Sequence, residues 1–354
     1  MVSQMDVSAG AKNLLVNCAQ LTSDDSLIIV SEEERFGWYE DALTRVIFDE
    51  ASKMGVKTKI IEVGEPKNKE TEELRDLISN FDCALFLARI GDQNRFETRE
   101  PPRKRVMCYA RTVESLASKF GTIDHRALID LKNAINSIFL NSRTIRVSCS
   151  NGSNLTGKML VSEPFQNQDV NVFRFPMVVP MPILASSFSG NVVVSNYLTP
   201  TGSKVYSPNY LKLSDSLNVE IDKGRIINVH GHREAKKDFE NHYDFVSQKF
   251  KLEKYYVHSW HAGIHPGIKY DQPIDINPDR WSNTMFASPK YLHFHTCGDY
   301  PPGEICWMLK NPTIEIDANA LWDNGFLRVR EFDSTKNCLE KWPQLSNLYT
   351  QISS

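Results

Sequence analysis

Two hydrophobic patterns divide the chain, and the first covers roughly its N-terminal 143 residues. There, segments with apolar positions three or four apart alternate with short continuous apolar runs. The first kind of segment predicts helices over 8–20, 38–54, 70–80 and 124–140. The second kind predicts buried strands over 26–30, 56–63 and 83–87. Such alternation predicts an open, parallel-type sheet with helices on both faces.

Short strands dominate the second pattern, after residue 143. They are predicted over 144–150, 190–198, 217–222, 224–231, 291–296 and 312–317. One helix is predicted over 233–250. Gly224, in the turn between two of the strands, favours a hairpin because glycine accepts a positive φ. The predicted fold class is therefore α/β: an α/β domain at 1–143, then an α+β domain at 144–354 that is rich in antiparallel strands and carries the functional site.

Composition narrows the class of protein. A hydrophobic content of 41% in 354 residues is ordinary for a globular chain with a sizeable core. The net charge of −3 argues against a nucleic-acid or membrane-surface binder, and the one basic run, 103–105, is interpreted as a solvated loop. The start of the chain lacks the pattern of a signal peptide, and no apolar run approaches the length of about 20 residues that spans a membrane. Seven scattered cysteines without a CxxC pair fit reduced thiols, so we expect a cytoplasmic protein.

Histidines are concentrated in the second part of the chain, where eight of the nine lie between residues 230 and 295. Five of these form two tight groups: His258, His261 and His265, and then His293 and His295. On a strand, the last two point to the same face, because side chains alternate. Neutral imidazole is the commonest metal ligand in proteins, and Asp299 or Glu304 could complete a site of two histidines and one carboxylate, which suits non-haem iron(II). The alternative is that these histidines cap strands or bond the backbone.

Other groups are weaker candidates. His230 and His232 follow a predicted strand end and are better explained as part of a solvated turn. The segment 150–157 could line a pocket, although an ordinary connection between strands explains it equally well. Cys306 is a soft ligand candidate, but a lone buried cysteine is more often a small hydrophobe. No GxSxG, Walker A, GxGxxG or HExxH motif occurs, so serine hydrolase, P-loop and zincin functions have no support.

A series of segments carries a family resemblance. These are DSLIIV (25–30), IRVSCSNGSNLTG (145–157), LNVEIDKGRIINVHG (217–231), GIHPG (263–267) and EICWMLKNPTIEID (304–317). In order and spacing they resemble the family that includes the aminopeptidase T metallopeptidases and the bacterial 2,5-dihydroxypyridine 5,6-dioxygenases. The length is closer to the dioxygenase branch. The resemblance implies a homodimer that acts on a small molecule or a short peptide.

The chain departs from both branches at the metal ligands. The peptidases use a dinuclear site with two glutamates, and the segment that should supply the first, 175–182, has no carboxylate. The dioxygenases hold one iron with a histidine before the Gly-x-x-Pro turn and a later His-x-Asp pair. Here that pair reads Glu304-Ile305-Cys306, and His258 and His261 flank the position of the first histidine.

Three hypotheses follow. The first is a metal-dependent enzyme with one divalent ion, Fe(II) ahead of Zn(II) or Mn(II), that acts on a small cyclic or aromatic substrate. For it we expect His261 and Glu304 to be catalytic, and metal ligands from His258, His265, His293, His295 and Glu304. The second is a divergent member without metal chemistry, which binds or transforms a peptide or small molecule. The third is an aminopeptidase T-like metallopeptidase.

Overall fold

The computed structural model describes residues 3–66, 71–93, 95, 104–160, 172–299 and 303–350. The chain forms two compact units. Unit 1 comprises residues 1–129 and 162–178, and unit 2 comprises residues 130–161 and 179–354. The architecture is the predicted α/β class, with a parallel sheet in unit 1 and two antiparallel sheets in unit 2.

Unit 1 is built on a five-stranded sheet in which every pairing is parallel. Its strands, in spatial order, are β2 (Lys57–Val63), β1 (Ser26–Glu32), β3 (Cys83–Leu87), β4 (Lys104–Cys108) and β7 (Phe173–Phe175). The central strands are buried on both faces, which explains why they appear in the sequence as continuous apolar runs. The three predicted strands of this part of the chain are therefore confirmed.

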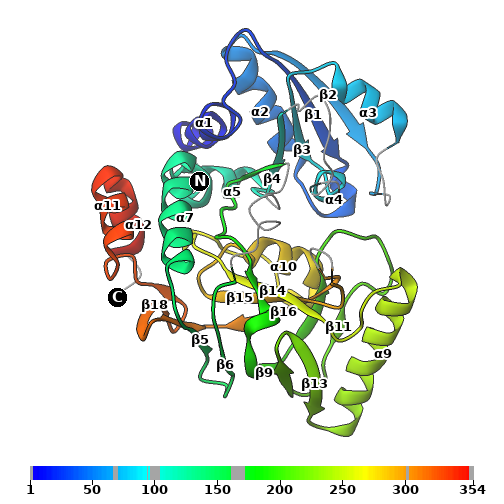
Figure 1. The fold of residues 1–354 in the computed structure, drawn as a ribbon. Coiled ribbons are helices and arrows are strands. Elements are labelled where there is room, and N and C mark those ends of the chain that lie inside the picture. Colours follow the sequence, from blue (N-terminus) through cyan, green and yellow to red (C-terminus); the bar gives the residue numbers. More distant parts are fainter. Residues whose placement is uncertain are drawn as a thin grey trace. The chain divides into compact units, whose positions relative to one another are not determined.

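Helices connect and cover these strands. They are α1 (Gln4–Lys12), α2 (Asp41–Lys53), α3 (Glu72–Ser79), α4 (Ile90–Gln93), α5 (Val113–Ala117), α6 (Lys119–Thr122) and α7 (His125–Leu140). The first predicted helix begins four residues earlier than expected and continues as a π-helix over Asn13–Cys18. Figure 1 shows α1 and α2 on one side of the sheet and α3 on the other, as right-handed crossovers require.

The basic run was interpreted wrongly as a loop. Residues 101–103 lie outside the described residues, but Lys104 and Arg105 begin β4. Arg105 is buried and its guanidinium lies 4.5 Å from the centre of the Phe86 ring. The aliphatic stem and the cation–π contact let a charged residue occupy a strand that the charge pattern assigned to solvent.

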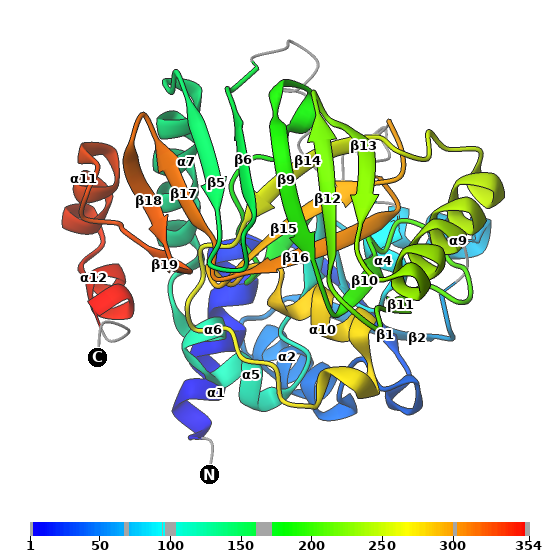
Figure 2. The ribbon, with the colours of Figure 1, turned by 90° about the horizontal axis from the view of Figure 1, so that it is seen from below.

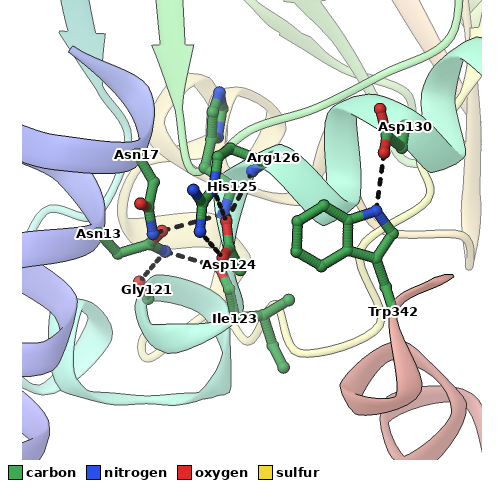
Figure 3. Close-up of polar contacts among 9 residues, drawn as sticks. All are labelled: Asn13, Asn17, Gly121, Ile123, Asp124, His125, Arg126, Asp130 and Trp342. Atoms are coloured by element: carbon green, nitrogen blue, oxygen red, sulfur yellow. Dashed lines mark hydrogen bonds and ion pairs between the residues drawn. The ribbon is translucent and has the colours of Figure 1, made fainter. Parts of the chain in front are cut away.

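The side chain of Asn13 fixes the entry to α7 (Figure 3). Its Nδ2 donates to the carbonyl oxygens of Gly121 and Ile123, at 2.7 and 2.6 Å, and its Oδ1 accepts from the backbone N–H of His125 at 2.9 Å. Asn13 is buried, so these three bonds replace water for backbone groups that α6 and α7 leave unpaired at their ends.

Unit 2 contains two antiparallel sheets. The six-stranded sheet consists, in spatial order, of β11 (Leu211–Lys212), β10 (Tyr197–Pro200), β16 (Ile305–Lys310), β15 (Tyr291–Thr296), β14 (Val257–Ala262) and β8 (Ile183–Leu184). The eight-stranded sheet consists of β13 (Arg225–His230), β12 (Leu217–Asp222), β9 (Ser189–Val194), β6 (Asn154–Gly157), β5 (Ile145–Ser148), β17 (Thr313–Ile316), β18 (Asn319–Asp323) and β19 (Phe326–Leu327). Figure 2 shows the larger sheet in front, with β14, β15 and β16 crossing behind it.

One predicted strand of unit 2 is two strands. The segment 190–198 was expected to be continuous, but it forms β9 and β10, which belong to different sheets. The chain turns between them at Asn196, whose φ is +66°. Asparagine tolerates this left-handed conformation better than most residues do, so it lets the strand change sheets.

Aromatic side chains fill the interior of unit 2. Trp260 of β14 packs edge-on against Phe139 and Phe188, at centroid distances of 6.1 and 5.5 Å. Phe139, in α7, also stacks on Trp322 of β18. These rings are all fully buried, and burying each stabilises the fold by about 1.5–3 kcal/mol relative to exposure. This aromatic core packs against one face of the six-stranded sheet. The opposite face carries the candidate functional site.

The remaining helices of unit 2 are α9 (Arg233–Phe250), α10 (Pro278–Met285), α11 (Asp333–Lys341) and α12 (Pro343–Thr350). The predicted helix over 233–250 matches α9, whereas α10 was not predicted. None of the helices in the described part of the chain is long and apolar enough to span a membrane.

Candidate metal centre

Three histidines leave the same face of the six-stranded sheet. In the antiparallel pairing of β14 with β15, His261 stands opposite His293, and Ser259 stands opposite His295. Residues that are directly paired, or two apart on one strand, share a face. Trp260 and Phe294, between them in sequence, therefore point to the opposite face and into the core.

The three imidazoles are close enough to share one ion. The Nε2 atoms of His261 and His295 are 2.9 Å apart, and the ring centres of His261 and His293 are 4.0 Å apart. One ring nitrogen from each histidine lies within 4.8 Å of the others, and all three residues are buried. No other cluster of three metal-ligating side chains with this spacing occurs among the described residues.

The 2.9 Å separation of the Nε2 atoms of His261 and His295 is compatible with a shared metal ion and also with a shared proton. Imidazole nitrogens bind first-row metals at about 2.0–2.1 Å, so two of them in adjacent positions at a right angle lie about 3 Å apart. The same distance fits an N–H···N hydrogen bond between neutral rings. A metal and a proton would thus compete for the same lone pairs, as is usual for histidine ligands. The donor set fits a divalent transition metal.

A phenylalanine ring covers the histidines. Phe286, which follows α10, has its ring centre 3.5 Å from that of His293 and 4.7 Å from that of His261. Its position depends on Gly263, because a Cβ there would come within 2.0–2.4 Å of the backbone of Ala287 and Ser288. The close approach of these two chain segments places an apolar aromatic wall beside the imidazoles.

His258 and His265 lie outside this group. The Nδ1 of His258 is 2.9 Å from the hydroxyl of Ser259, and burial lowers its pKa to about 4, so it is neutral at pH 7. The Nδ1 of His265 accepts from the backbone N–H of Gly267 at 3.1 Å. The backbone N–H of His265 donates to the carbonyl oxygen of Ala287 at 2.8 Å. Both histidines form hydrogen bonds with residues next to the cluster. Their role as metal ligands stays a prediction.

Glu304 has polar neighbours of its own. Its Oε1 accepts a hydrogen bond from the Ser203 hydroxyl, and its backbone carbonyl accepts one from the Tyr206 hydroxyl at 3.3 Å. Its backbone N–H donates to the carbonyl oxygen of Cys297 at 3.0 Å. Burial, with the Glu304 charge as a second cause, raises the pKa of the Cys297 thiol to about 12. The Glu304 carboxylate is not part of the three-histidine cluster. Its predicted catalytic and ligand roles stay predictions.

One histidine of β15, His295, lies next to the segment that resembles the position of the family's later ligands. The resemblance implied a His-x-Asp pair at 304–306, and Cys306 of β16 stands directly opposite His295. Burial raises the pKa of the Cys306 thiol to about 12, which makes it a poor ligand at neutral pH. The neighbouring strand β15 therefore places an imidazole, that of His295, opposite Cys306.

The fold is similar to those of a 2,5-dihydroxypyridine dioxygenase and an aminopeptidase T. The solved structure of the dioxygenase from Pseudomonas putida KT2440 superposes with a TM-score of 0.60 at 13% identity, over 95% of this chain and all of the other. Wild-type AmpT, an aminopeptidase T from Thermus thermophilus, superposes with a TM-score of 0.51 at 9% identity, over 92% of this chain and 99% of its own. These likenesses confirm the fold that the sequence resemblance implied.

Comparison by sequence adds nothing to this likeness. No family model matches the chain. No curated protein matches it either.

Proposed function

We propose that His261, His293 and His295 bind one divalent transition metal and that the protein is a metal-dependent enzyme. The observation that carries the proposal is the 2.9 Å separation of two Nε2 atoms beside a third buried imidazole on one rigid sheet face. Backbone pairing of β14 with β15 fixes where the three side chains begin, so little ordering is required when a metal binds.

We further propose that this metal is Fe(II) and that the substrate is a small cyclic or aromatic compound. The likeness to a dioxygenase is the stronger of the two structural similarities and supports an oxidative reaction. When bound, the metal would supply open positions where substrate and O₂ can meet. Phe286 would exclude water from this place and offer its ring to a planar substrate.

His261 cannot serve as the general base through Nε2 if that atom binds the metal. Glu304, which is buried beside Ser203 and Tyr206, is then the remaining candidate for the acid–base role predicted from the sequence. In this role Glu304 would act on a substrate that also reaches the metal.

A hydrolytic function is the second candidate. No carboxylate belongs to the three-histidine cluster among the described residues, and three neutral imidazoles are a ligand set of catalytic zinc. Such a site would activate water, which is compatible with the weaker likeness to AmpT. A dinuclear peptidase site has less support, since the described residues contain one such cluster only.

Metal analysis of protein made without a histidine tag tests the proposal. We expect about one equivalent of iron or zinc after reconstitution, lost in His293→Ala and kept in His230→Ala. His230 is an exposed histidine that pairs with Glu220 and is the matched control. Failure to retain iron, zinc or manganese in the unsubstituted protein would refute the metal site.

Two activity assays separate the candidate reactions. Oxygen uptake with dihydroxylated aromatic compounds tests the dioxygenase, and release of p-nitroaniline from aminoacyl derivatives tests the peptidase. Oxygen uptake that requires Fe(II) supports the first candidate, and amide cleavage that requires Zn(II) supports the second. A metal-loaded protein silent in both assays would contradict both reactions while leaving the metal site in place.

A further inference from the structure

The parallel sheet of unit 1 reverses its strand order between β1 and β3. The chain proceeds from β1 to β2 on one side and then returns to β3 and β4 on the other. At such a reversal the connections diverge, and open α/β sheets bind ligands there, beyond the carboxyl ends of the strands. Charged residues follow the strands at this edge: Glu32 ends β1, Arg89 follows β3, and Arg111 follows β4.

The first two of these charges neutralise each other. The Glu32 carboxylate accepts from Nη2 of Arg89 at 2.6 Å, from its Nε at 2.9 Å and from its backbone N–H at 3.0 Å. Asp92, the other buried carboxylate of this edge, is likewise engaged: it accepts from the hydroxyl of Tyr109 and pairs with Arg95 at 3.2 Å. Both carboxylates therefore already have a cationic partner.

Arg111 has no such partner. Its residue is 3% exposed, and its Nε and Nη1 are buried without an acceptor. Its guanidinium forms no hydrogen bond or ion pair with any of the described residues. It lies over two rings of unit 1, at 4.4 Å from the centre of Trp38 and 5.6 Å from that of Tyr39.

Among the described residues, no hydrogen bond or ion pair compensates this buried charge. Arginine cannot lose its proton to avoid burial. The attraction of a guanidinium to aromatic faces recovers only part of the hydration that burial removes. The Tyr39 hydroxyl gives no help, because it donates to the carbonyl of Cys108 at 2.8 Å. The guanidinium of Arg111 is therefore a planar fork of N–H donors, whose geometry matches that of an oxyanion.

We propose that Arg111 anchors a binding site for a small oxyanion, a carboxylate or a phosphate, at the edge of the sheet where β1 and β3 diverge. Trp38 holds the fork in place, since it contacts Arg111 and, at 4.8 Å, the guanidinium of Arg89 as well. The residues named for this site all belong to unit 1, whereas the histidine cluster belongs to unit 2.

Calorimetric titration of the full chain with inorganic phosphate and with benzoate, at constant ionic strength, tests the site. The protein is first treated with a chelator, so that no metal can take up the anion. We expect one saturable site, weakened about tenfold or more in Arg111→Gln and also weakened in Arg111→Lys, which keeps the charge but not the fork. Arg126→Gln is the control, because it removes an exposed, Asp124-paired arginine of the same unit and should change nothing.

The two anions distinguish the source of the ligand. Tighter binding of phosphate assigns a phosphorylated ligand, and tighter binding of benzoate assigns an organic acid. Trp38 is the only tryptophan in unit 1, so a fluorescence change that disappears in Trp38→Phe supports binding at this place even if Arg111→Gln fails to fold. Equal binding to the protein and to its Arg111→Lys variant, or no saturable binding of either anion, would overturn the proposal whatever the metal analysis shows.

Discussion

Cys306 stands opposite His295 in the pairing of β15 with β16, so both side chains leave the same face of the six-stranded sheet. An aspartate at 306 would place a carboxylate beside the cluster. In metal-free Cys306→Asp we expect the free energy of unfolding to fall by about 3 kcal/mol, because burial removes the hydration of the carboxylate and the neighbouring hydroxyls of Thr199 and Ser282 replace only part of it. A metal should reverse the loss by accepting the carboxylate as a ligand.

Thermal unfolding with and without metal checks this expectation, and Cys306→Ser is the uncharged control. The gain in melting temperature on adding metal should be larger in the aspartate variant than in the serine variant. Equal gains would show that position 306 does not reach the bound ion.

Phe286 should control how fast the site exchanges its ion. We expect Phe286→Ala to lose metal to a chelator about tenfold faster, because water gains access to the imidazoles that the ring covers. The exposed aromatic Phe326 offers a control, and Phe326→Ala should leave the rate unchanged. The rate is measured by the absorbance of a coloured chelator. An unaltered rate in Phe286→Ala would mean that another group limits access.

Burial of His242 makes stability depend on pH. Its pKa is lowered to about 4, whereas an imidazole in the unfolded chain titrates near 6.5. Between these values only the unfolded chain binds the proton, so stability is lost as pH falls from about 6.5 towards 4. We expect the protein to lose about 2 kcal/mol more than His242→Gln between about pH 7 and pH 5 in urea unfolding. Parallel losses in the two proteins would contradict a neutral, buried His242.

Asn13 should contribute more to stability than its neighbour Asn17. Asn13→Ala leaves three buried or partly buried backbone groups without their bonds, at a cost of about 3 kcal/mol. Asn17, whose amide donates to Asn13 at 3.0 Å, makes none of those bonds, and Asn17→Ala should cost less than about 1 kcal/mol. Chemical unfolding followed by circular dichroism measures both, and similar costs would argue against the role of Asn13 at the entry to α7.

The sequence predicted the parallel sheet of unit 1 well because β1 and β3 are buried on both faces and so appear as continuous apolar runs. It did not predict β14, which is also buried on both faces but carries His258, Ser259 and His261 among its apolar residues. Polar residues in a buried strand break the apolar run that identifies such strands. Because this strand was not predicted, the histidines of 258–265 could not be assigned to the two faces of a sheet.

The choice among these histidines also depends on a local irregularity. The pairing of β14 with β15 shifts its register between Val257 and Ser259, next to His258. Such a shift changes which side chains share a face of the sheet, and the residue types do not indicate where it occurs. The HxH spacing of β15 was sufficient to predict that His293 and His295 share a face, whereas the identity of their partner required the three-dimensional pairing.

The contact between Gly263 and the backbone of Ala287 and Ser288 limits which residues can occupy position 263, although this position offers no side-chain donor to the cluster. Even the methyl group of alanine would lie 2.0–2.4 Å from backbone atoms, which cannot rotate away as a flexible side chain can, so any larger residue would have to displace the chain segment next to Phe286. Sequences that share this arrangement of the histidines and the Phe286 ring should therefore keep glycine here, which makes position 263 a marker for recognising the same arrangement in other chains.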